Sequence, residues 1–228
     1  MKLSRSLSLA AVAVLASRDT RAEPCPMFGL ALEVLRPQAD VAADGGLVVA
    51  EVPRMADKAQ APDFSKWQVR GAKLGAPDSL AIAPGLRIIR PPAGAASFTL
   101  EVAGKVKGKA RVAKAPPPTL PAPAISRVVS GSTTSKHVTR YVTVFPTQAA
   151  PKGAIALVLV DAKGKPISWG RTGDGADRVV VYSTEGGCVT TFSNGTEIAQ
   201  PGERVTAFWI DSTGRRSPAS APITVVKP

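Results

Sequence analysis

The 228-residue chain has a single histidine, His137, and two cysteines, Cys25 and Cys188. Catalysis by a Ser-His-Asp or Cys-His arrangement would have to use His137 as its base. Its surroundings, TTSKHVT, contain neither a nucleophile elbow nor a glycine-framed nucleophile. The sequence therefore predicts an exposed histidine at the start of a strand and no catalytic residue of this class. One histidine and two distant cysteines also do not provide the closely spaced ligand pairs of a zinc site.

Phosphate-cradling glycine motifs are missing, and acidic residues are few. The segment RTGDGADR, residues 171–178, offers the carboxylates of Asp174 and Asp177 to calcium. It lacks the spaced acidic series and terminal Glu of a calcium loop, and Arg171 and Arg178 oppose a cation, so we predict an ordinary hairpin loop. A carboxylate pair for sugar hydrolysis stays open, because its members can be distant in the chain and adjacent in space. We expect no cofactor and no metal.

The longest apolar run at the start of the chain extends from Leu7 to Ala16, half the ~20 residues of a membrane span. Lys2 and Arg5 precede it and small residues follow, which is the pattern of a secretory signal peptide over residues 1–22. The small residues also allow cleavage after Ala16. We expect export to the periplasm or the cell surface, with no transmembrane segment in the mature chain.

The two cysteines would enter an oxidising compartment, in which a disulfide is the expected state. A bridge between Cys25 and Cys188 would join positions 163 apart. In the chain-entropy model a loop of this length is worth roughly 5 kcal/mol before native-state strain is subtracted. The alternative is two unpaired or intermolecular thiols.

The chain has 29 Lys and Arg residues but only 17 Asp and Glu residues, which gives a formal net charge of +12. Residues 1–22 hold four basic residues and one acid, so their removal leaves +9. Such a field favours anionic partners and says nothing about the fold. Aromatics are not interleaved with the cations, which together with export disfavours nucleic acid. Expected partners are anionic envelope polymers or another envelope protein.

The segment KAPPPTLPAPAI, residues 114–125, has five prolines in twelve positions. Proline lacks the amide donor that a sheet needs and favours extended geometry, so residues 115–123 are predicted to form a semi-rigid linker. The linker would separate a first module, residues 23–114, from a second, residues 124–228. Each is near the size of a single β-sandwich.

Runs of β-branched and aromatic residues between Gly, Pro, Asn and Asp clusters predict strands in both modules, and helical spacing is not sustained anywhere. In the second module the runs are HVTRYVTVFPT, GAIALVLVDAKGKPISW, DRVVVYST and ERVTAFWID, with hairpin turns at DAKGKP and SNGT. In the first they are KWQVRG, DSLAIA, LRIIRP and SFTLEVAG. Because Trp209 and Phe208 project from opposite faces of ERVTAFWID, we predict a central strand whose second face is partly covered.

The stretch PGERVTAFWIDSTGRRSPASAPITVV, residues 201–226, resembles the last two strands of an immunoglobulin-like or fibronectin type III-like domain. In that family a Val-rich strand leads to an Asp-x-x-Gly turn, a Ser and Pro stretch and a closing strand. VLRPQADVAADGGLVVAEVP, residues 34–53, is similar to the entry of bacterial immunoglobulin-like domains. The paired intra-domain cysteines of antibody-type members are missing. The resemblance implies an all-β fold of two antiparallel immunoglobulin-like β-sandwich modules joined by the proline-rich linker.

A row of cations, Lys105, Lys107, Lys109 and Arg111, alternates with Val, Gly and Ala just before the linker. In a strand these cations would project from one side at intervals of about 6.6–6.8 Å. Such a row can bind phosphates of envelope polymers, or it can guard an exposed sheet edge against pairing with another chain. Edge protection or solvation is the preferred interpretation.

These observations predict an exported, non-catalytic, envelope-associated binding or structural protein. One alternative is an envelope-glycan hydrolase that uses an unidentified carboxylate pair. Another is an assembly chaperone that lends a sheet edge to a partner.

Overall fold

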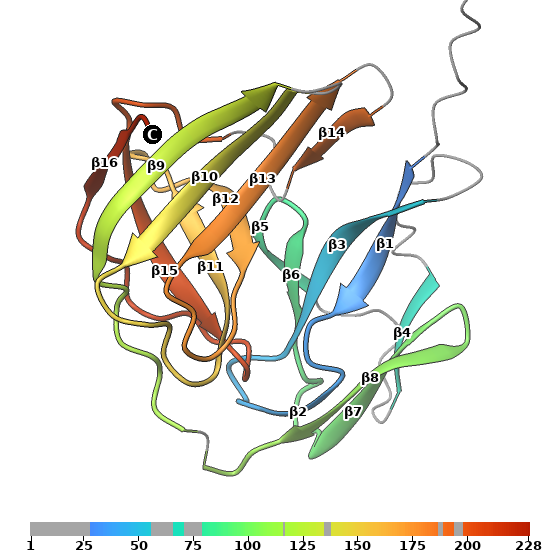
Figure 1. Ribbon diagram of the computed structural model, residues 1–228. Helices are drawn as coiled ribbons and strands as arrows, with labels where there is room; N and C mark the ends of the chain where they lie inside the picture. Colours follow the sequence, from blue (N-terminus) through green and yellow to red (C-terminus); the bar gives the residue numbers. More distant parts are fainter. Residues whose placement is uncertain are drawn as a thin grey trace, which may run out of the picture.

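The computed structural model describes residues 28–55, 66–70, 79–115, 117–134, 138–186, 189–193 and 198–228. Within these ranges the chain forms sixteen strands (Figure 1). No helix in this part of the chain is long and apolar enough to cross a membrane. The proposed signal peptide, His137, both cysteines and most of the SNGT turn lie outside the described residues.

The first half of the chain contributes two four-stranded sheets. One has the order β1-β3-β6-β5 and the other the order β2-β8-β7-β4. The bounds of these strands are β1 Phe28–Val34, β2 Gln38–Val41, β3 Leu47–Met55, β4 Trp67–Arg70, β5 Ser79–Ala83, β6 Leu86–Ile89, β7 Ser97–Val102 and β8 Lys105–Val112.

The second half forms one eight-stranded sheet, in the order β12-β11-β15-β16-β9-β10-β13-β14. It curls so that the β11 and β15 end packs against β9, β10 and β13. The bounds are β9 Ile125–Thr134, β10 Val138–Pro146, β11 Ala154–Val160, β12 Pro166–Arg171, β13 Val179–Gly186, β14 Val189–Ser193, β15 Arg204–Asp211 and β16 Ile223–Val226.

The prediction of an all-β protein is confirmed, and the sheets are mixed rather than purely antiparallel. β2 pairs in parallel with β8, and β16 pairs in parallel with β9. In each half a strand near the start of that half therefore lies beside its last strand and runs in the same direction. The predicted runs coincide with strands, whereas no run was predicted for β1, β2, β9 or β14. β9, ISRVVSGSTT, is dominated by Ser and Thr, so its apolar periodicity is weak.

The sheets stack in four layers that enclose three hydrophobic cores (Figure 1). The first core lies between the two four-stranded sheets and includes Leu47, Val49, Trp67, Ile89, Phe98 and Leu100. The third lies within the curled sheet and includes Val128, Val142, Val144, Leu157, Leu159 and Trp209. The middle core joins the two halves and includes Val48, Leu86, Ile88, Val158, Trp169, Phe208 and Ile210.

β11 and most of β15, which border the middle core, are buried on both faces. In β11, AIALVLV, all seven residues are buried, with Leu157 in the third core and Val158 in the middle one. A strand covered on both faces has a continuous apolar run instead of alternation. β15 behaves likewise, since Trp209 lies in the third core and Phe208 in the middle core. The prediction of a covered second face for ERVTAFWID is confirmed, and the first half of the chain supplies the cover.

Polar contacts reinforce the junction between the halves. Trp169 Nε1 donates a hydrogen bond to the carbonyl oxygen of Pro84 at 3.0 Å. Arg171 Nη1 and Glu33 Oε1 form an ion pair at 2.8 Å. The backbone nitrogen of Gly46 donates to the carbonyl oxygen of Thr213 at 2.9 Å. The two halves therefore meet through an apolar core, an ion pair and direct backbone contact.

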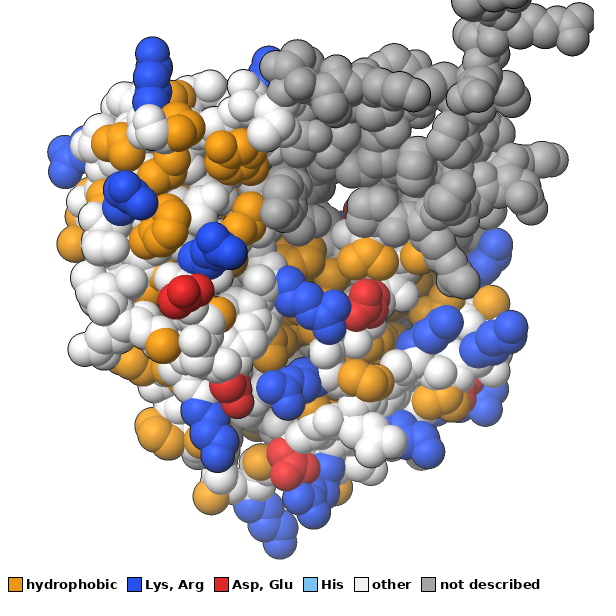
Figure 2. All heavy atoms as spheres, in the orientation of Figure 1, with side chains coloured by type: hydrophobic (Ala, Val, Ile, Leu, Met, Phe, Trp, Pro, Cys, Tyr) orange, Lys and Arg blue, Asp and Glu red, His pale blue; other side chains and the backbone are white. Residues whose placement is uncertain are grey.

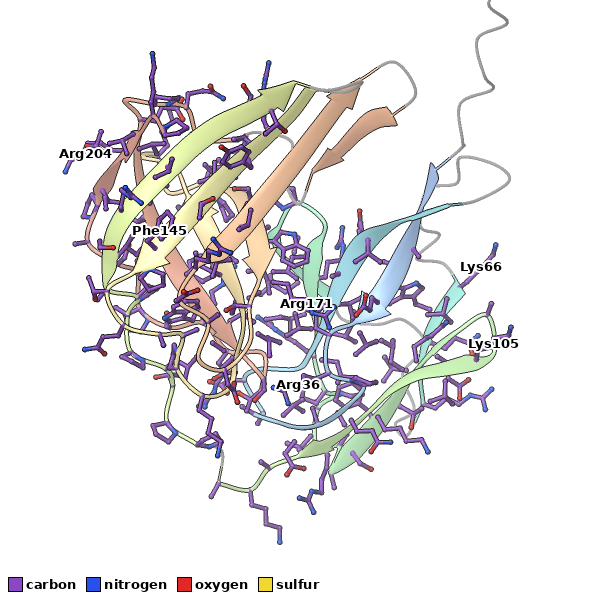
Figure 3. The ribbon with its side chains drawn as sticks, in the orientation of Figure 1. Arg36, Lys66, Lys105, Phe145, Arg171 and Arg204 are labelled. Carbon is purple, nitrogen blue, oxygen red and sulfur yellow. The ribbon has the colours of Figure 1, made fainter. Side chains whose placement is uncertain are left out.

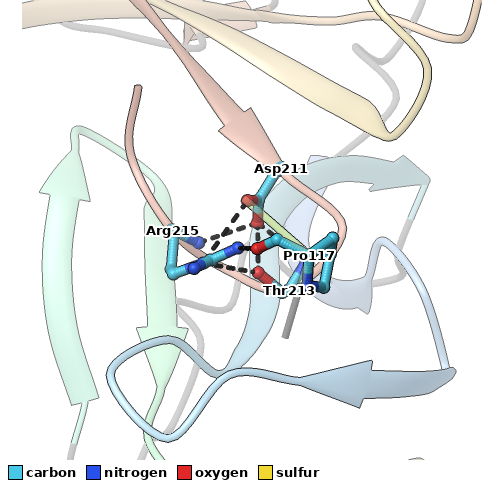
Figure 4. A network of polar contacts seen from close by, with 4 residues as sticks. All are labelled: Pro117, Asp211, Thr213 and Arg215. Atoms are coloured by element: carbon cyan, nitrogen blue, oxygen red, sulfur yellow. Dashed lines mark hydrogen bonds and ion pairs between the residues drawn. The ribbon is translucent and has the colours of Figure 1, made fainter. Parts of the chain in front are cut away.

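The proline-rich segment is held against the body of the protein. Near its start, Ala113 N donates to Val41 O at 2.9 Å, and near its end Thr147 N donates to Ala124 O at 2.7 Å. Between them Arg215 Nη2 donates to the carbonyl oxygen of Pro117 (Figure 4). The segment thus runs along the molecule as a strap attached at three points.

Arg215 is positioned by the turn that follows β15. Asp211 Oδ1 accepts hydrogen bonds from Thr213 N at 2.8 Å and from Arg215 N at 2.9 Å, and Arg215 Nε donates to Thr213 Oγ1 at 3.1 Å (Figure 4). Asp211 and Arg215 also form an ion pair at 3.6 Å, with only 7% and 11% of their side chains exposed. The Asp-x-x-Gly turn seen in the sequence therefore orients the arginine that binds the strap.

Candidate anion-binding face

The outward side of the β2-β8-β7-β4 sheet, which we call the cationic face, carries the predicted row of basic residues. Lys105, Lys107, Lys109 and Arg111 are all exposed in β8, whereas Gly108 and Ala110 are buried between them. A Cβ at Gly108 would lie 3.1 Å from the Leu47 side chain, so β8 lies directly on the first core. Figure 2 shows blue basic side chains gathered over this end of the molecule.

A β-bulge interrupts the row. Leu100 pairs with Gly108 but Glu101 pairs with Val106, so Lys107 is the extra residue on β8. Val106, which strict alternation would bury, is 51% exposed as a result. A bulge breaks the ladder locally and bends the strand. The four cations are therefore not evenly spaced along one line.

The structure also decides where β8 lies in its sheet. Its second half, Lys109–Val112, pairs with Gln38–Val41 on one side and with β7 on the other. An interior strand has no edge to protect, so edge protection does not explain Lys109 and Arg111. Among the described pairings, only the first half of β8 lacks a neighbour on the β2 side. Edge protection is therefore ruled out for the second half of the row, whereas solvation, the other part of the preferred interpretation, agrees with the exposure of Lys109 and Arg111.

The acids on this face are bound by arginines. Arg111 Nε and Nη2 donate to Asp40 Oδ1 and Oδ2 at 2.9 and 2.8 Å. These hydrogen bonds lower the pKa of Asp40 and raise the pKa of Arg111. Across the sheet, Arg70 Nε lies 2.9 Å from Glu101 Oε2. The pairing leaves Lys105, Lys107 and Lys109 as the exposed cations of β8 with no acidic partner among the described residues.

Two open hollows lie on either side of the Asp40–Arg111 pair. One, of about 510 Å³, is lined by Gln38, Ala39, Asp40, Lys109, Ala110 and Arg111. The other, of about 560 Å³, extends from the same pair past Ser97 to Lys114 and Ala115. The lysine row continues from the first hollow toward Lys105, which lies near Lys66 at the far end of the sheet (Figure 3). The surface can therefore contact an extended ligand along its length.

The other residues singled out in the sequence are not gathered at this face. Asp174 Oδ1 accepts a hydrogen bond from Gly153 N at 2.8 Å, which gives that carboxylate a structural role in its loop. The described part of the chain contains no group of three or more His, Cys, Asp or Glu residues arranged to hold a metal. Cys25 and Cys188 lie outside the described residues, so their disulfide stays a prediction.

Sequence reasoning missed Asp40 and Arg70 as members of the face. Asp40 meets Arg111 across 71 positions, through the parallel pairing of β2 with β8. Arg70 meets Glu101 through the pairing of β4 with β7. The only signal in the sequence is the alternation within KWQVRG, which places Arg70 opposite the buried Trp67 and Val69.

Comparison with known proteins adds little to this description. No protein family model and no curated protein matches the chain. Among solved structures it is similar to a biofilm associated protein, BSP domain, with 16% sequence identity and a TM-score of 0.26. The match covers 84% of this chain and 29% of that one, so this chain spans less than a third of its length. A TM-score of this size does not define a shared topology.

Proposed function

We propose that this protein is an exported, non-catalytic, envelope-associated protein whose cationic face binds anionic envelope polymers. The observation that carries the proposal is the set of three exposed lysines on β8, on a face where the two acids among the described residues, Asp40 and Glu101, are each paired with an arginine. A polyanion laid along this face meets several positive charges at once. Exposed charges of this kind are screened by salt, so binding should weaken as ionic strength rises.

The finer description of the fold belongs to the same proposal. We infer two immunoglobulin-like β-sandwich modules, with the proline-rich segment between them. Two features support this: the size of each half, and the parallel pairing of an early strand with the last strand in both halves. Export is supported by the signal-peptide pattern of residues 1–22.

The ion pairs favour binding over the two alternative functions. A glycan hydrolase needs two carboxylates facing one sugar bond. In the described residues, Glu33, Asp40, Glu101 and Asp211 each form an ion pair with an arginine. A sheet-edge chaperone needs an unpaired strand, and the second half of β8 does not provide one because it is paired on both sides.

The test compares two triple variants of equal charge change. The first changes Lys105, Lys107 and Lys109 to Glu and keeps Arg111, so that Asp40 retains its partner. The control changes Lys152, Lys163 and Lys227 to Glu, because these exposed lysines lie in the second half of the chain. Each protein is sedimented with isolated cell-envelope fragments at low and at high salt.

We expect the wild type and the control to pellet with the fragments at low salt and to be released at high salt, while the face variant stays in the supernatant. Equal loss in both triple variants would mean that net charge alone drives binding. Unchanged binding of the face variant would remove the cationic face from the function. Either result contradicts the proposal.

A further inference from the structure

A second surface lies at the opposite end of the stack of layers, on the outward face of β9 and β10 (Figure 1). Val142 and Val144 of β10 point into the third core, and Tyr141, Thr143 and Phe145 alternate with them. On β9 the register partners of these three residues are Gly131, Val129 and Arg127. Figure 2 shows hydrophobic and basic side chains next to one another on this side, and Figure 3 labels Phe145 there.

The ring of Tyr141 lies across the neighbouring strand. A Cβ placed on Gly131 would lie 2.6 Å from Tyr141 Oη and 2.7 Å from Cζ, so the phenol end occupies the space above this glycine. Pro228 bounds the same space, 2.9 Å from that Cβ position. The Tyr141 side chain is half-buried, which leaves part of its aromatic ring open to a ligand. An aromatic face packs against the C–H face of a sugar ring, because it is electron-rich.

Arg127 provides a fixed cation on the same surface. Its guanidinium carbon lies 4.7 Å from the centroid of the Phe145 ring, in a cation–π contact that holds the exposed side chain in place. A guanidinium held in this way keeps a planar set of donors, which matches the two oxygens of a carboxylate.

The distance between the Tyr141 ring and Arg127 indicates how long a ligand must be to contact both. Gly131, under the Tyr141 ring, and Arg127 are four residues apart on β9, which corresponds to about 13 Å along a strand. Val129 of β9, which pairs with Thr143 of β10, lies between them. A ligand that contacts both groups must be longer than one sugar ring.

The charge of the residues on this surface indicates which chemical class of ligand it would bind. Among the residues of β9 and β10 that share the side of Tyr141, Arg127 is charged and none is acidic. We propose that this face binds an acidic polysaccharide, with Tyr141 stacked on one sugar ring and Arg127 paired with a carboxylate further along the same polymer. The site goes beyond the proposed function, because it uses a different sheet and adds sugar rings to the recognised chemistry.

The experiment measures the affinity of the purified protein for three polymers. Polygalacturonate has both sugar rings and carboxylates, its fully methyl-esterified form has the rings without the charge, and inorganic polyphosphate has charge without rings. The variants are Tyr141→Leu, which keeps an apolar side chain without an aromatic face, and Arg127→Gln, which removes an exposed charge. The triple lysine variant of the cationic face is the matched control.

We expect Tyr141→Leu to weaken polygalacturonate binding roughly tenfold and to leave polyphosphate binding unchanged. Arg127→Gln should weaken binding of polygalacturonate but not of its methyl ester. Thermal unfolding of each variant shows whether it is folded, and Arg127→Gln tests the site even if Tyr141→Leu does not fold.

Two results would overturn the inference: no binding of polygalacturonate by the wild type, or binding that both single variants leave intact. If only the triple lysine variant loses polygalacturonate, the polymer binds the cationic face. That outcome rejects the site on β9 and β10 while it supports the proposed function.

Discussion

At the scale of single residues, Arg111 differs from the three lysines that share its strand. Its two hydrogen bonds to Asp40 join β2 to β8, and they pair its positive charge with a carboxylate and use two of its five N–H donors. Exposed pairs of this kind add little stability. The structure therefore divides the row into one residue that ties two strands together and three lysines that can bind a ligand.

The Asp40–Arg111 pair predicts a specific pH dependence. Because the pKa of Asp40 is lower in the folded protein than its ordinary value of 3.8, the pair stabilises the fold above that value and loses this effect as the pH falls through the folded pKa. Arg111→Gln should raise the pKa of Asp40 toward 3.8, because its hydrogen-bond donors are lost. Titration of the Asp40 side chain by NMR measures this. Lys152→Gln is the control and should leave the titration unchanged; an equal shift in both variants would contradict the prediction.

Glycine is required where the two halves touch backbone to backbone. Gly214 has a φ of +81°, and a Cβ there would lie 2.3 Å from the carbonyl oxygen of Gly46. Gly94 has a similar φ of +73°, but no atom lies within 4 Å of its Cβ position. A substitution at Gly94 therefore measures the free-energy cost of the positive φ alone, without a steric clash. We expect Gly94→Ala to lower the free energy of unfolding by about 1–2 kcal/mol and Gly214→Ala by more than about 3 kcal/mol. Urea denaturation of the two variants checks the difference, and equal losses would show that the backbone contact is unimportant.

At the scale of elements, the proline-rich segment and β8 both have roles that depend on their neighbours. Prolines prevent residues 113–124 from joining a sheet, but they do not determine where the segment lies. The position of the segment is determined by its hydrogen bonds to Val41, Arg215 and Thr147. Likewise, the lysine-rich composition of β8 is typical of an edge strand, but the pairing of β2 with β8 places the second half of β8 inside the sheet.

The next prediction concerns how firmly the strap is held, which trypsin cleavage after its one lysine, Lys114, can report. Arg215→Ala removes the hydrogen bond to Pro117, so the segment should detach more often and trypsin should cut after Lys114 several times faster. The variant should also lose about 1–3 kcal/mol of stability, because Asp211 loses its ion-pair partner in a nearly buried position. Arg204→Ala changes an exposed arginine of β15 and is the control. Cleavage at the same rate in both variants would show that Arg215 does not hold the strap.

At the scale of the whole molecule, the middle core makes the two halves depend on each other. β3 and β6 contribute to both the first and middle cores, and β11 and β15 to both the middle and third cores. If the halves came apart, the apolar face of each would be exposed to water. The hydrophobic effect therefore favours the packed arrangement.

This packing predicts that the protein unfolds as one unit. Phe208→Ala, in the middle core, should cost about 3–5 kcal/mol and lower the unfolding midpoint of both halves. Phe98→Ala, in the first core alone, should do the same if unfolding is cooperative. Hydrogen exchange with mass spectrometry at increasing urea follows β7 and β13 separately. Unfolding of β7 at lower urea than β13 in the Phe98→Ala protein would show that the halves unfold independently.

The sequence by itself determined the all-β class, the position of most strands and the alternation of β8, because these follow from local periodicity and turn chemistry. Only the tertiary structure decided that β2 lies beside β8, that Arg111 is bound by Asp40, that Tyr141 lies over Gly131 and that the middle core joins the halves. Each of these is a meeting of residues from different strands, and in all but the contact of Tyr141 with Gly131 the strands are far apart in the chain. The apolar runs of β11 and β15 indicate in the sequence that the second face of each strand is buried. The sequence does not show which surface covers that face, because the hydrophobic effect is not directional and any apolar face of suitable shape can pack there.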